Sequence, residues 1–356
     1  MNEIDEHFRG NDEQPTVNSR FICTANHGFA PYAQEELRRL FGSVKSTVLV
    51  AGEVLLVTLP DETISAVDQI KAHAPMFLRH LFPVQFQEEG SSVEAALSRL
   101  ASFVMNRSEL QGQILSVQVR KTNDSHWEES AGALKQAIMD KLADAAFDFA
   151  VRGADFVLSL FVAKDFWYAG ISRADDNLSD WSGGAVRFQK EEGQVSRAKF
   201  KLLEAEAAFG IDFTVFRKAL DIGAAPGGWT SFLLERGLQV TAVDPARMDS
   251  SVLQSPRLTF LRKNAGEVKF RDSEFDVLVC DMSWSPKQMA KLVTGLLYSL
   301  ARGGSAIVTV KLMHKKPLAL IQDVISSFEQ AGMQVQQAKQ LFHNRDEITL
   351  YMIKYS

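Results

Sequence analysis

The chain has 356 residues, of which 46% are hydrophobic and 23% charged, an ordinary globular balance with room for two or three domains. Its polar, acidic start (1–15) lacks the apolar stretch of a secretory signal, and no apolar run approaches the roughly 18 residues that span a bilayer. Cys23 and Cys280 are the only cysteines, which excludes a disulfide framework and a cysteine zinc cage. We therefore expect a soluble cytoplasmic protein.

The net charge of −5 is unevenly distributed along the chain. Residues 1–180 hold 16 Lys and Arg against 26 Asp and Glu, a net charge of −10, whereas residues 181–356 hold 23 against 18, a net charge of +5. If a nucleic acid binds, its backbone is expected mostly on the C-terminal half.

Residues 1–19 predict a disordered tail, and residues 20–88 an α+β ferredoxin-like subdomain. The ferredoxin-like subdomain is expected because the segments follow a β-α-β-β-α order. They are strand 20–26, helix 31–42, strands 46–52 and 53–59, and helix 62–74.

Residues 89–173 predict a second α+β unit, and residues 174–194 a linker, because that stretch is polar, contains glycine and has no periodicity. The elements expected in the second unit are helix 93–105, strand 114–122, helix 131–147, and strands 156–164 and 166–172.

From residue 195 to 356 strands and helices alternate, which predicts a Rossmann-like α/β domain with a mostly parallel sheet and helices on both faces. Ligands of such sheets bind outside the carboxyl ends of the strands. The expected strands are 218–223, 239–244, 258–264, 275–282, 304–312 and 347–355, and the expected helices include 229–237, 287–301 and 317–332.

A glycine-rich turn follows the first of these strands, from Gly223 to Gly228. Gly223 permits a tight turn, Pro226 sets the entry to the helix, and Gly227 and Gly228 let a ligand approach bare backbone. The turn is neither the dinucleotide fingerprint nor a phosphate-binding loop. With Asp244 some twenty residues later as a partner for ribose hydroxyls, it favours S-adenosylmethionine; the alternative is a plain Gly-Pro turn with a surface aspartate.

The stretch 196–206, the turn 220–230, and the segments 280–282, 310–312 and 345–353 resemble the FtsJ-type RNA ribose 2′-O-methyltransferases. The resemblance is clear over 196–356. It is strongest to members that carry a THUMP domain and methylate a cytidine ribose of large-subunit rRNA, which implies a THUMP-like RNA-binding subdomain over 89–173. The family's catalytic tetrad would be Lys201, Asp281, Lys311 and Glu347.

The resemblance also implies the cofactor contacts. Ser196 begins the family motif, and Asp281 would lie near the methyl end of the donor. Asn264 stands where the family usually has an aspartate for the adenine amine, which its carbonyl oxygen can still accept, and Ala225 stands where the nearest members have cysteine. Trp229 belongs to the same motif, although its indole, like that of Trp181, is expected to be structural. The implied cofactor-binding set is Ser196, Gly223, Ala225, Pro226, Gly227, Gly228, Trp229, Asp244, Asn264 and Asp281.

A ribose 2′-hydroxyl is a poor nucleophile and needs a base placed in line with the methyl group. An amine serves as that base only when neutral, which a second nearby cation favours. Lys311, with Lys201 beside it, is therefore the expected proton acceptor, and Asp281 and Glu347 are expected to orient the two lysines. The alternative for any one of these lysines is a solvated surface residue without a catalytic role.

Other reactions fit less well. Amino-methylation of bases uses an Asp/Asn-Pro-Pro-aromatic turn, whereas this chain has Asp281-Met-Ser-Trp284. Carbon-5 methylation of cytosine needs a thiolate, and Cys280 is expected to be a packed core residue. A tRNA or another RNA remains open as the substrate, as does an inactive RNA-binding ribosome-assembly factor.

Seven histidines show no paired ligand spacing, so no metal is expected. Trp284 is expected either to stack on a base or to pack in the core. The acidic N-terminal half is expected to dock RNA through a small basic face, or else to bind a protein or a second copy. Candidate phosphate contacts, each otherwise a solvated charge, are Arg120, Lys121, Lys135, Lys141, Arg187, Lys190, Arg197, Lys199, His314, Lys315 and Lys316.

Overall fold

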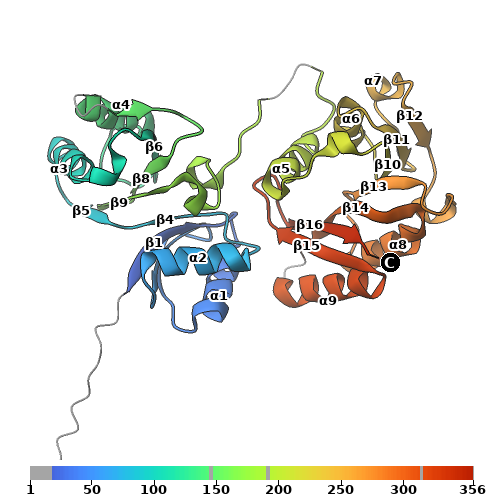
Figure 1. Ribbon diagram of the computed structural model, residues 1–356, viewed down its shortest axis with the longest axis horizontal. Coiled ribbons are helices and arrows are strands. Elements are labelled where there is room, and N and C mark those ends of the chain that lie inside the picture. Colours follow the sequence, from blue (N-terminus) through green and yellow to red (C-terminus); the bar gives the residue numbers. More distant parts are fainter. Residues whose placement is uncertain (1–17, 144–146, 190–192, 313–315, 356) are drawn as a thin grey trace, which may run out of the picture. The chain divides into compact units, whose positions relative to one another are not determined.

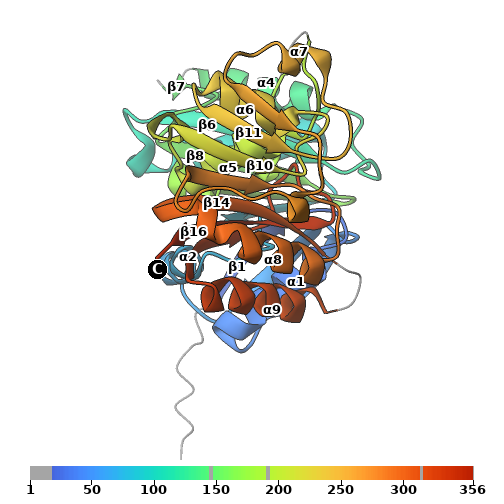
Figure 2. The same ribbon diagram turned by 90° about the vertical axis from the view of Figure 1, so that its right-hand side faces the viewer.

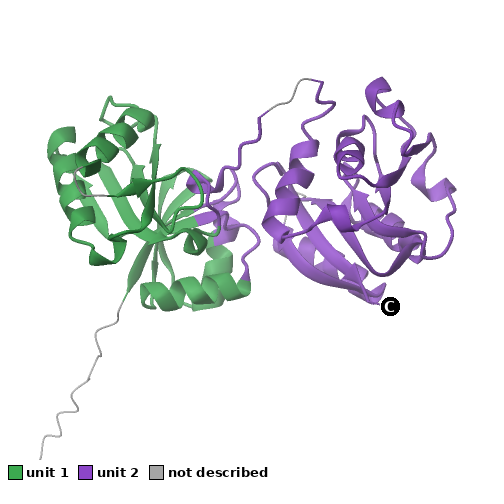
Figure 3. Ribbon diagram, turned by 45° about the horizontal axis from the view of Figure 1, so that its top comes forward, with its two compact units in different colours: residues 1–23, 34–73, 81–178 green, residues 24–33, 74–80, 179–356 purple. Residues whose placement is uncertain are grey.

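A computed structural model describes residues 18–143, 147–189, 193–312 and 316–355. The chain divides into two compact units, 1–23, 34–73 and 81–178 against 24–33, 74–80 and 179–356 (Figure 3). Within the described residues, no helix combines the length and apolar character needed to cross a lipid bilayer. The boundaries that the sequence suggests for the subdomains and the linker stay predictions.

The first sheet has the element order and strand order of a ferredoxin-like fold, as predicted (Figure 1). Its strands lie in the order β2-β3-β1-β4, so the first strand is central. The sequence did not predict the fourth strand, which is only four residues long. The elements are β1 (Ser19–Thr24), α1 (Ala30–Phe41), β2 (Lys45–Val50), β3 (Val54–Leu59), α2 (Thr63–His73) and β4 (His80–Pro83).

The second sheet has the order β5-β9-β8-β6-β7 and packs against two helices. Both helices begin after a serine whose hydroxyl accepts a main-chain N–H of the first turn: Ser92 from Ala95 and Ser130 from Ala133. Trp127 and Trp167 meet edge to face in the core between the helices and the sheet. The elements are β5 (Phe86–Glu89), α3 (Val93–Met105), β6 (Ile114–Lys121), α4 (Ala131–Leu142), β7 (Asp148–Phe149), β8 (Phe156–Val162) and β9 (Phe166–Arg173).

The third sheet has seven strands in the order β12-β11-β10-β13-β14-β16-β15 (Figure 2). Neighbouring strands are parallel except at β16, which runs antiparallel to β14 and β15. This confirms the predicted Rossmann-like domain. The strands are β10 (Lys218–Ile222), β11 (Gln239–Val243), β12 (Leu258–Leu261), β13 (Phe275–Cys280), β14 (Leu300–Lys311), β15 (Met333–Lys339) and β16 (Glu347–Lys354).

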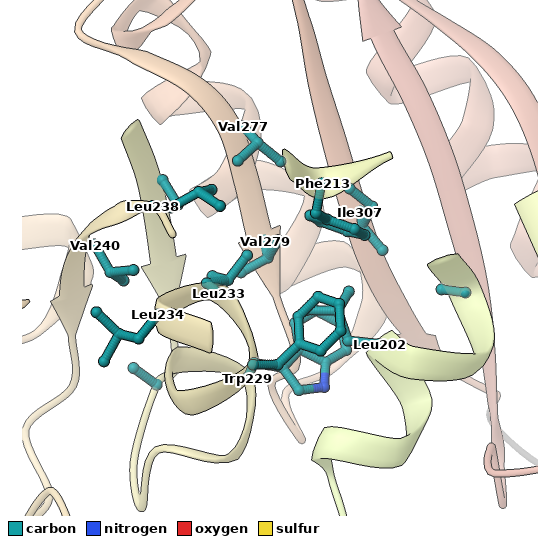
Figure 4. Close-up of a cluster of buried hydrophobic side chains, with 14 of the residues drawn as sticks. Leu202, Phe213, Trp229, Leu233, Leu234, Leu238, Val240, Val277, Val279 and Ile307 are labelled. Atoms are coloured by element: carbon teal, nitrogen blue, oxygen red, sulfur yellow. The ribbon is translucent and has the colours of Figure 1, made fainter. Parts of the chain in front are cut away.

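Helices cover both faces of this sheet. On one face, α5 (Lys199–Phe209) and α6 (Gly228–Glu235) pack on the alternate strand residues that point toward them. Figure 4 shows Leu202 of α5 in one cluster with the strand residues Val277 and Ile307. On the other, α8 (Pro286–Leu296) packs against α9 (Pro317–Gln330). Phe232 in the first cluster is fully buried, and replacing such a phenylalanine with alanine typically costs about 3–5 kcal/mol.

This topology gathers one end of five strands at one edge of the sheet. The carboxyl ends of β10, β11, β13 and β14 meet there because those strands are parallel. Because β16 is antiparallel to β14, its first residues lie at the same edge.

Candidate active site

Three members of the predicted tetrad are in direct contact at this edge. Lys201 Nζ lies 3.0 and 3.2 Å from the two carboxylate oxygens of Asp281 and 3.7 Å from Glu347 Oε1. All three side chains are between 16 and 19% exposed, so the ion pairs are shielded from bulk water but remain accessible. One ammonium thus bridges two carboxylates that would otherwise repel each other.

The fourth member, Lys311, is placed by strand register. It ends β14 directly opposite Glu347, the first residue of β16. Side chains alternate along a strand, so Ile307, Thr309 and Lys311 share a face of β14. Ile307 packs in the core cluster that contains α5 residues, and Tyr351 of β16 packs on the same cluster. Lys311 and Glu347 therefore emerge on the face that carries Lys201.

Thr309 is a member of the site that sequence reasoning missed. Its hydroxyl donates to Asp281 Oδ1 at 2.7 Å, and its side chain is 1% exposed. The spacing of two residues between Thr309 and Lys311 in one strand was the signal that could have found it.

Glu204 is a second such residue. It lies nearly one helical turn after Lys201 on α5 and is 5% exposed. Its carboxylate accepts the main-chain N–H groups of Phe342 and His343, at 2.7 and 2.9 Å, in the loop that leads into β16. The helix that carries Lys201 is thereby tied to the loop before Glu347.

Asn26 and Arg79 secure the same loop. Asn26 Nδ2 donates to the carbonyl oxygens of Leu341 and Asn344, and Arg79 Nη1 donates to Asn26 Oδ1 at 2.5 Å. The Arg79 guanidinium also lies over the Phe342 ring, 5.1 Å from its centroid.

The glycine turn has the close approaches that its sequence predicted. Gly223 has a φ of +75°, and a Cβ there would lie 2.4 Å from Met282 Cγ. Gly227 has a φ of +117°, and a Cβ on Gly228 would lie 2.9 Å from Ser196 Cβ. Only glycine, which has no Cβ, fits against these neighbours.

Two further predicted cofactor residues, Asp244 and Asn264, follow the ends of β11 and β12. Asp244, directly after β11, accepts the Ala225 N–H at 3.1 Å and the Ala246 N–H at 2.7 Å, one on each oxygen. Ala225 and Pro226 are joined by a cis peptide bond. Asn264 is exposed, and its amide nitrogen donates to Glu267 Oε1 at 3.0 Å.

Ser196 and Trp229 connect the turn to α5. The Ser196 hydroxyl accepts the Ala198 N–H at 3.1 Å, and the Trp229 indole donates to the Ala198 carbonyl at 2.8 Å. Trp229 is 3% exposed in the core (Figure 4), so its indole is structural, as expected. Its place in a cofactor site stays a prediction.

Two buried titratable groups lie at the ends of the central strands. Burial raises the pKa of Asp221 to about 7, and the charges of Asp281 and Asp244 add to this rise, whereas the Thr230 hydroxyl, which donates at 2.6 Å, opposes it. Burial also raises the pKa of Cys280, with smaller contributions from Asp281 and Asp221. Cys280 is thus the packed core cysteine that was predicted and is poorly suited to thiolate chemistry.

Residues 194–327 match the FtsJ-like methyltransferase family. This part of the chain belongs to that family. The FtsJ-like match includes Lys201, Asp281, Lys311 and the glycine turn, and it ends before Glu347.

Curated relatives of the FtsJ-like domain bear the name ribosomal RNA large subunit methyltransferase M. The Halorhodospira halophila protein is 33% identical over 201 residues, covering 54% of this chain and 56% of the relative. The Psychromonas ingrahamii protein is 34% identical over 215 residues, covering 56% and 58%. The chain thus spans little more than half the length of these relatives. A match to the Cronobacter sakazakii protein covers 83% of this chain and 84% of the relative at 26% identity.

The structure corrects part of the expected RNA-contacting set. Lys199, on the FtsJ-like domain, is buried and pairs with Glu235 at 2.8 Å, so it is not available to phosphate. Trp284 is 44% exposed, so the core-packing alternative for it was wrong. Lys190, His314 and Lys315 lie outside the described residues.

In the N-terminal half, three of the four candidate cations contact other groups of the chain. Arg120 lies 3.9 Å from Glu53, Lys141 lies 2.7 Å from Glu94, and Lys121 donates to the carbonyl oxygens of Trp127 and Glu129. Among the residues that the structure describes, no three His, Cys, Asp or Glu side chains are grouped to hold a metal ion.

Proposed function

We propose that this protein transfers a methyl group from S-adenosylmethionine to a ribose 2′-hydroxyl of RNA, and that its substrate is large-subunit ribosomal RNA in the cytoplasm. The contact of Lys201 with Asp281 and Glu347, with Lys311 paired to Glu347 across the strands, carries this proposal. The name of the relatives supports the choice of RNA.

The chain offers a fitting place for the cofactor. The backbone of the glycine turn is bare at Gly223 and Gly227, which pack against Met282 and Met248, and Asp244 stands beside the turn with two carboxylate oxygens. Each of those oxygens already accepts one N–H and retains the capacity to accept a ribose hydroxyl. When bound there, S-adenosylmethionine supplies an electrophilic methyl carbon attached to a sulfonium.

The two lysines have different roles. Lys201 contacts two carboxylates, and its positive charge stabilises negative charge that develops on the 2′-oxygen. Lys311, as the neutral amine, would accept the proton of the 2′-hydroxyl while the oxygen bonds to the methyl carbon and the carbon–sulfur bond breaks, which leaves a neutral thioether. Asp281, fixed by Thr309, keeps Lys201 in place.

The test compares 2′-O-methyl sites in ribosomal RNA from cells with and without the gene, and from cells that carry Lys311→Ala. We expect one large-subunit site to disappear without the gene and to be lost with Lys311→Ala, because loss of a general base costs about 10²–10⁴-fold in rate. Near-normal methylation by Lys311→Ala would remove the assigned base. A site lost from tRNA would change the substrate, and no lost site in any RNA would favour an assembly factor without activity.

We further propose that the region 20–173, divided at residue 88 and with a THUMP-like second part, docks the RNA and is joined by the linker 174–194 to the catalytic domain 195–356. Of the four candidate cations in the N-terminal half, Lys135 is the one for which the structure records neither an ion pair nor a hydrogen bond among the described residues. Lys135→Glu should weaken RNA binding several-fold and reduce its salt dependence. Unchanged affinity would indicate that this face binds a protein or a second copy instead.

Deleting residues 1–180 would be a poorer test of docking. The deletion would also remove Asn26 and Arg79, which hold the loop before Glu347.

A further inference from the structure

The catalytic domain contains a cavity of about 870 Å³ that the tetrad and the glycine turn do not line. One wall is the segment 264–270 after β12, and the other is α8. We refer to it as the α8 cavity. Of the residues assigned to the cofactor, it includes Asn264 but not Asp244 or Gly223.

The cavity lies beside a crossover connection that contains no α-helix. Parallel strands are normally joined by an α-helix that covers the sheet. Residues 262–274, all of which the structure describes, join β12 to β13 with the single 3-10 turn Ala265–Glu267 and no α-helix. The side of α8 that faces this connection is therefore left uncovered, and Leu292 and Gly295 line the opening.

The lining has the chemistry that recognises a nucleotide. Trp284 presents an indole that is 44% exposed, and Tyr298, fixed where its hydroxyl accepts the Phe270 N–H at 2.9 Å, adds a second aromatic ring. Aromatic faces of this kind stack on unpaired bases. Lys269 and Lys291 place two ammonium groups at the cavity.

The balance of the lining also favours RNA over a purely apolar ligand. The two lysines outnumber the one carboxylate, Glu267, which is itself bonded to Asn264. The amides of Asn264 and Gln288 can donate to and accept from base edges.

The α8 cavity is also continuous in sequence with the catalytic site. Trp284 lies three residues after Asp281, and Asn264 is the residue predicted to meet the adenine of the cofactor. We propose that the α8 cavity holds an unpaired base of the RNA substrate, from a nucleotide close to the one that is methylated. The inference rests on the proposed function and extends it, because it predicts a single-stranded target whose flanking base is turned out.

Gly295 allows the cavity to be filled without disturbing the fold. It lies in the last turn of α8, and a Cβ there meets no described atom within 4 Å. Gly295→Leu therefore occupies the space, and a helix is expected to gain stability when it loses an interior glycine. Gly295→Ala, with a smaller side chain, should have a weaker effect.

The experiment uses the full chain and large-subunit ribosomal RNA from cells that lack the gene, and it measures kcat, the KM for RNA, the dissociation constant for S-adenosylmethionine, and Tm. For Gly295→Leu and Trp284→Ala we expect the KM for RNA to rise roughly 5- to 100-fold, the range for loss of one base–aromatic stack. Trp284→Phe should retain most of the affinity, and the dissociation constant for S-adenosylmethionine should not change. Ala207→Leu, at an exposed position of α5 that does not line the cavity, adds a leucine elsewhere on the same domain and controls for it.

Two results would overturn the inference while the wild type still methylates RNA. An unchanged KM for RNA in both Gly295→Leu and Trp284→Ala would show that no base enters the cavity. A weakened affinity for S-adenosylmethionine in these variants would assign the cavity to the cofactor instead. A wild type that methylates no RNA would refute the proposed function itself, and the inference with it.

Discussion

Glu204 Oε2 lies 2.7 Å from His343 Nδ1, and the Glu204 carboxylate also accepts the main-chain N–H groups of Phe342 and His343. This contact joins α5, which carries Lys201, to the loop that places Glu347. The His343 ring is in turn packed against Phe188 and Phe200, whose rings also contact each other. The buried Glu204 carboxylate, which takes no part in the chemistry, thus helps to set the distance between Lys201 and Glu347.

Replacing Glu204 with glutamine should therefore reduce catalysis through geometry. The amide keeps one acceptor oxygen but presents its NH2 group to main-chain donors, so the loop should shift. We expect kcat to fall about tenfold and stability to fall by about 1–3 kcal/mol, the cost of losing hydrogen bonds to a charged group. Methyl transfer and thermal unfolding of the same samples measure both quantities.

Glu206→Gln is the matched control for this change. Glu206 lies on the same helix and forms a bidentate pair with Arg236. It should lose some stability and retain kcat. Equal losses of kcat in the two variants would show that Glu204 has no selective part in placing the tetrad.

Thr309→Val tests whether the Asp281 carboxylate needs a fixed orientation. Valine has nearly the same shape but removes the 2.7 Å hydrogen bond to Asp281 Oδ1. We expect kcat to fall by about tenfold, with a stability cost of about 1–2 kcal/mol for the lost hydrogen bond, because Asp281 Oδ1 still accepts from Lys201. Thr349→Val removes a comparable buried bond, to Asn344, directly across the strands. A similar fall of kcat in Thr349→Val would indicate a general loosening of β14 and β16.

Asp221→Asn should change how stability depends on pH. The pKa of Asp221 in the folded chain is about 7, against an ordinary value of 3.8, so between these pH values the folded state binds a proton that the unfolded state does not. Stability of the wild type therefore falls as pH rises through this window, and the penalty, on the order of a few kcal/mol, is complete above pH 7. The asparagine variant lacks the penalty, so its stability relative to wild type should increase from pH 5 to pH 8 in denaturant titrations.

Asp212 provides a control of opposite sign. Its side chain accepts the hydroxyl and N–H of Thr214, and these bonds lower its pKa. The stability that these hydrogen bonds give to the folded chain is fully present above the ordinary pKa of 3.8, and it is lost as pH falls through the lowered pKa of the folded chain. Asp212→Asn should therefore lose stability relative to wild type at neutral pH. A pH profile of Asp221→Asn that parallels the wild type would contradict the raised pKa.

Gly223→Ala should weaken binding of S-adenosylmethionine and destabilise the domain. Its φ is +75°, and the added Cβ would lie 2.4 Å from Met282 Cγ, next to Asp281. Gly210→Ala separates the steric clash of the added Cβ from the strain of a positive φ. Gly210 has a φ of +63°, but its Cβ would meet no described atom within 4 Å. That variant should show only the left-handed strain of about 1–2 kcal/mol. Calorimetric titration with the cofactor and thermal unfolding distinguish the variants, and equal behaviour would remove the steric argument.

The local sequence was sufficient for several elements that border the site and for the glycine turn, but not for every strand, since β4 and β15 were not predicted. Alternating apolar residues predicted β10, β11, β13 and β14, helical spacing predicted α3, α8 and α9, and the run from Gly223 to Gly228 predicted a backbone cradle. Each of these features depends on residues that are neighbours along the chain. The family motif then named the tetrad, but not its distances.

Tertiary structure decided which of those residues face one another. Lys199 and Lys201 are two positions apart on one helix, yet one is buried against Glu235 and the other bridges Asp281 and Glu347. Glu347 reaches the site because β16 runs antiparallel to β14, and the α8 cavity exists because the crossover before β13 lacks an α-helix. Strand register and helix packing bring together residues that are far apart in the chain, and the electrostatic neighbours of a charge are set by those contacts rather than by its sequence position.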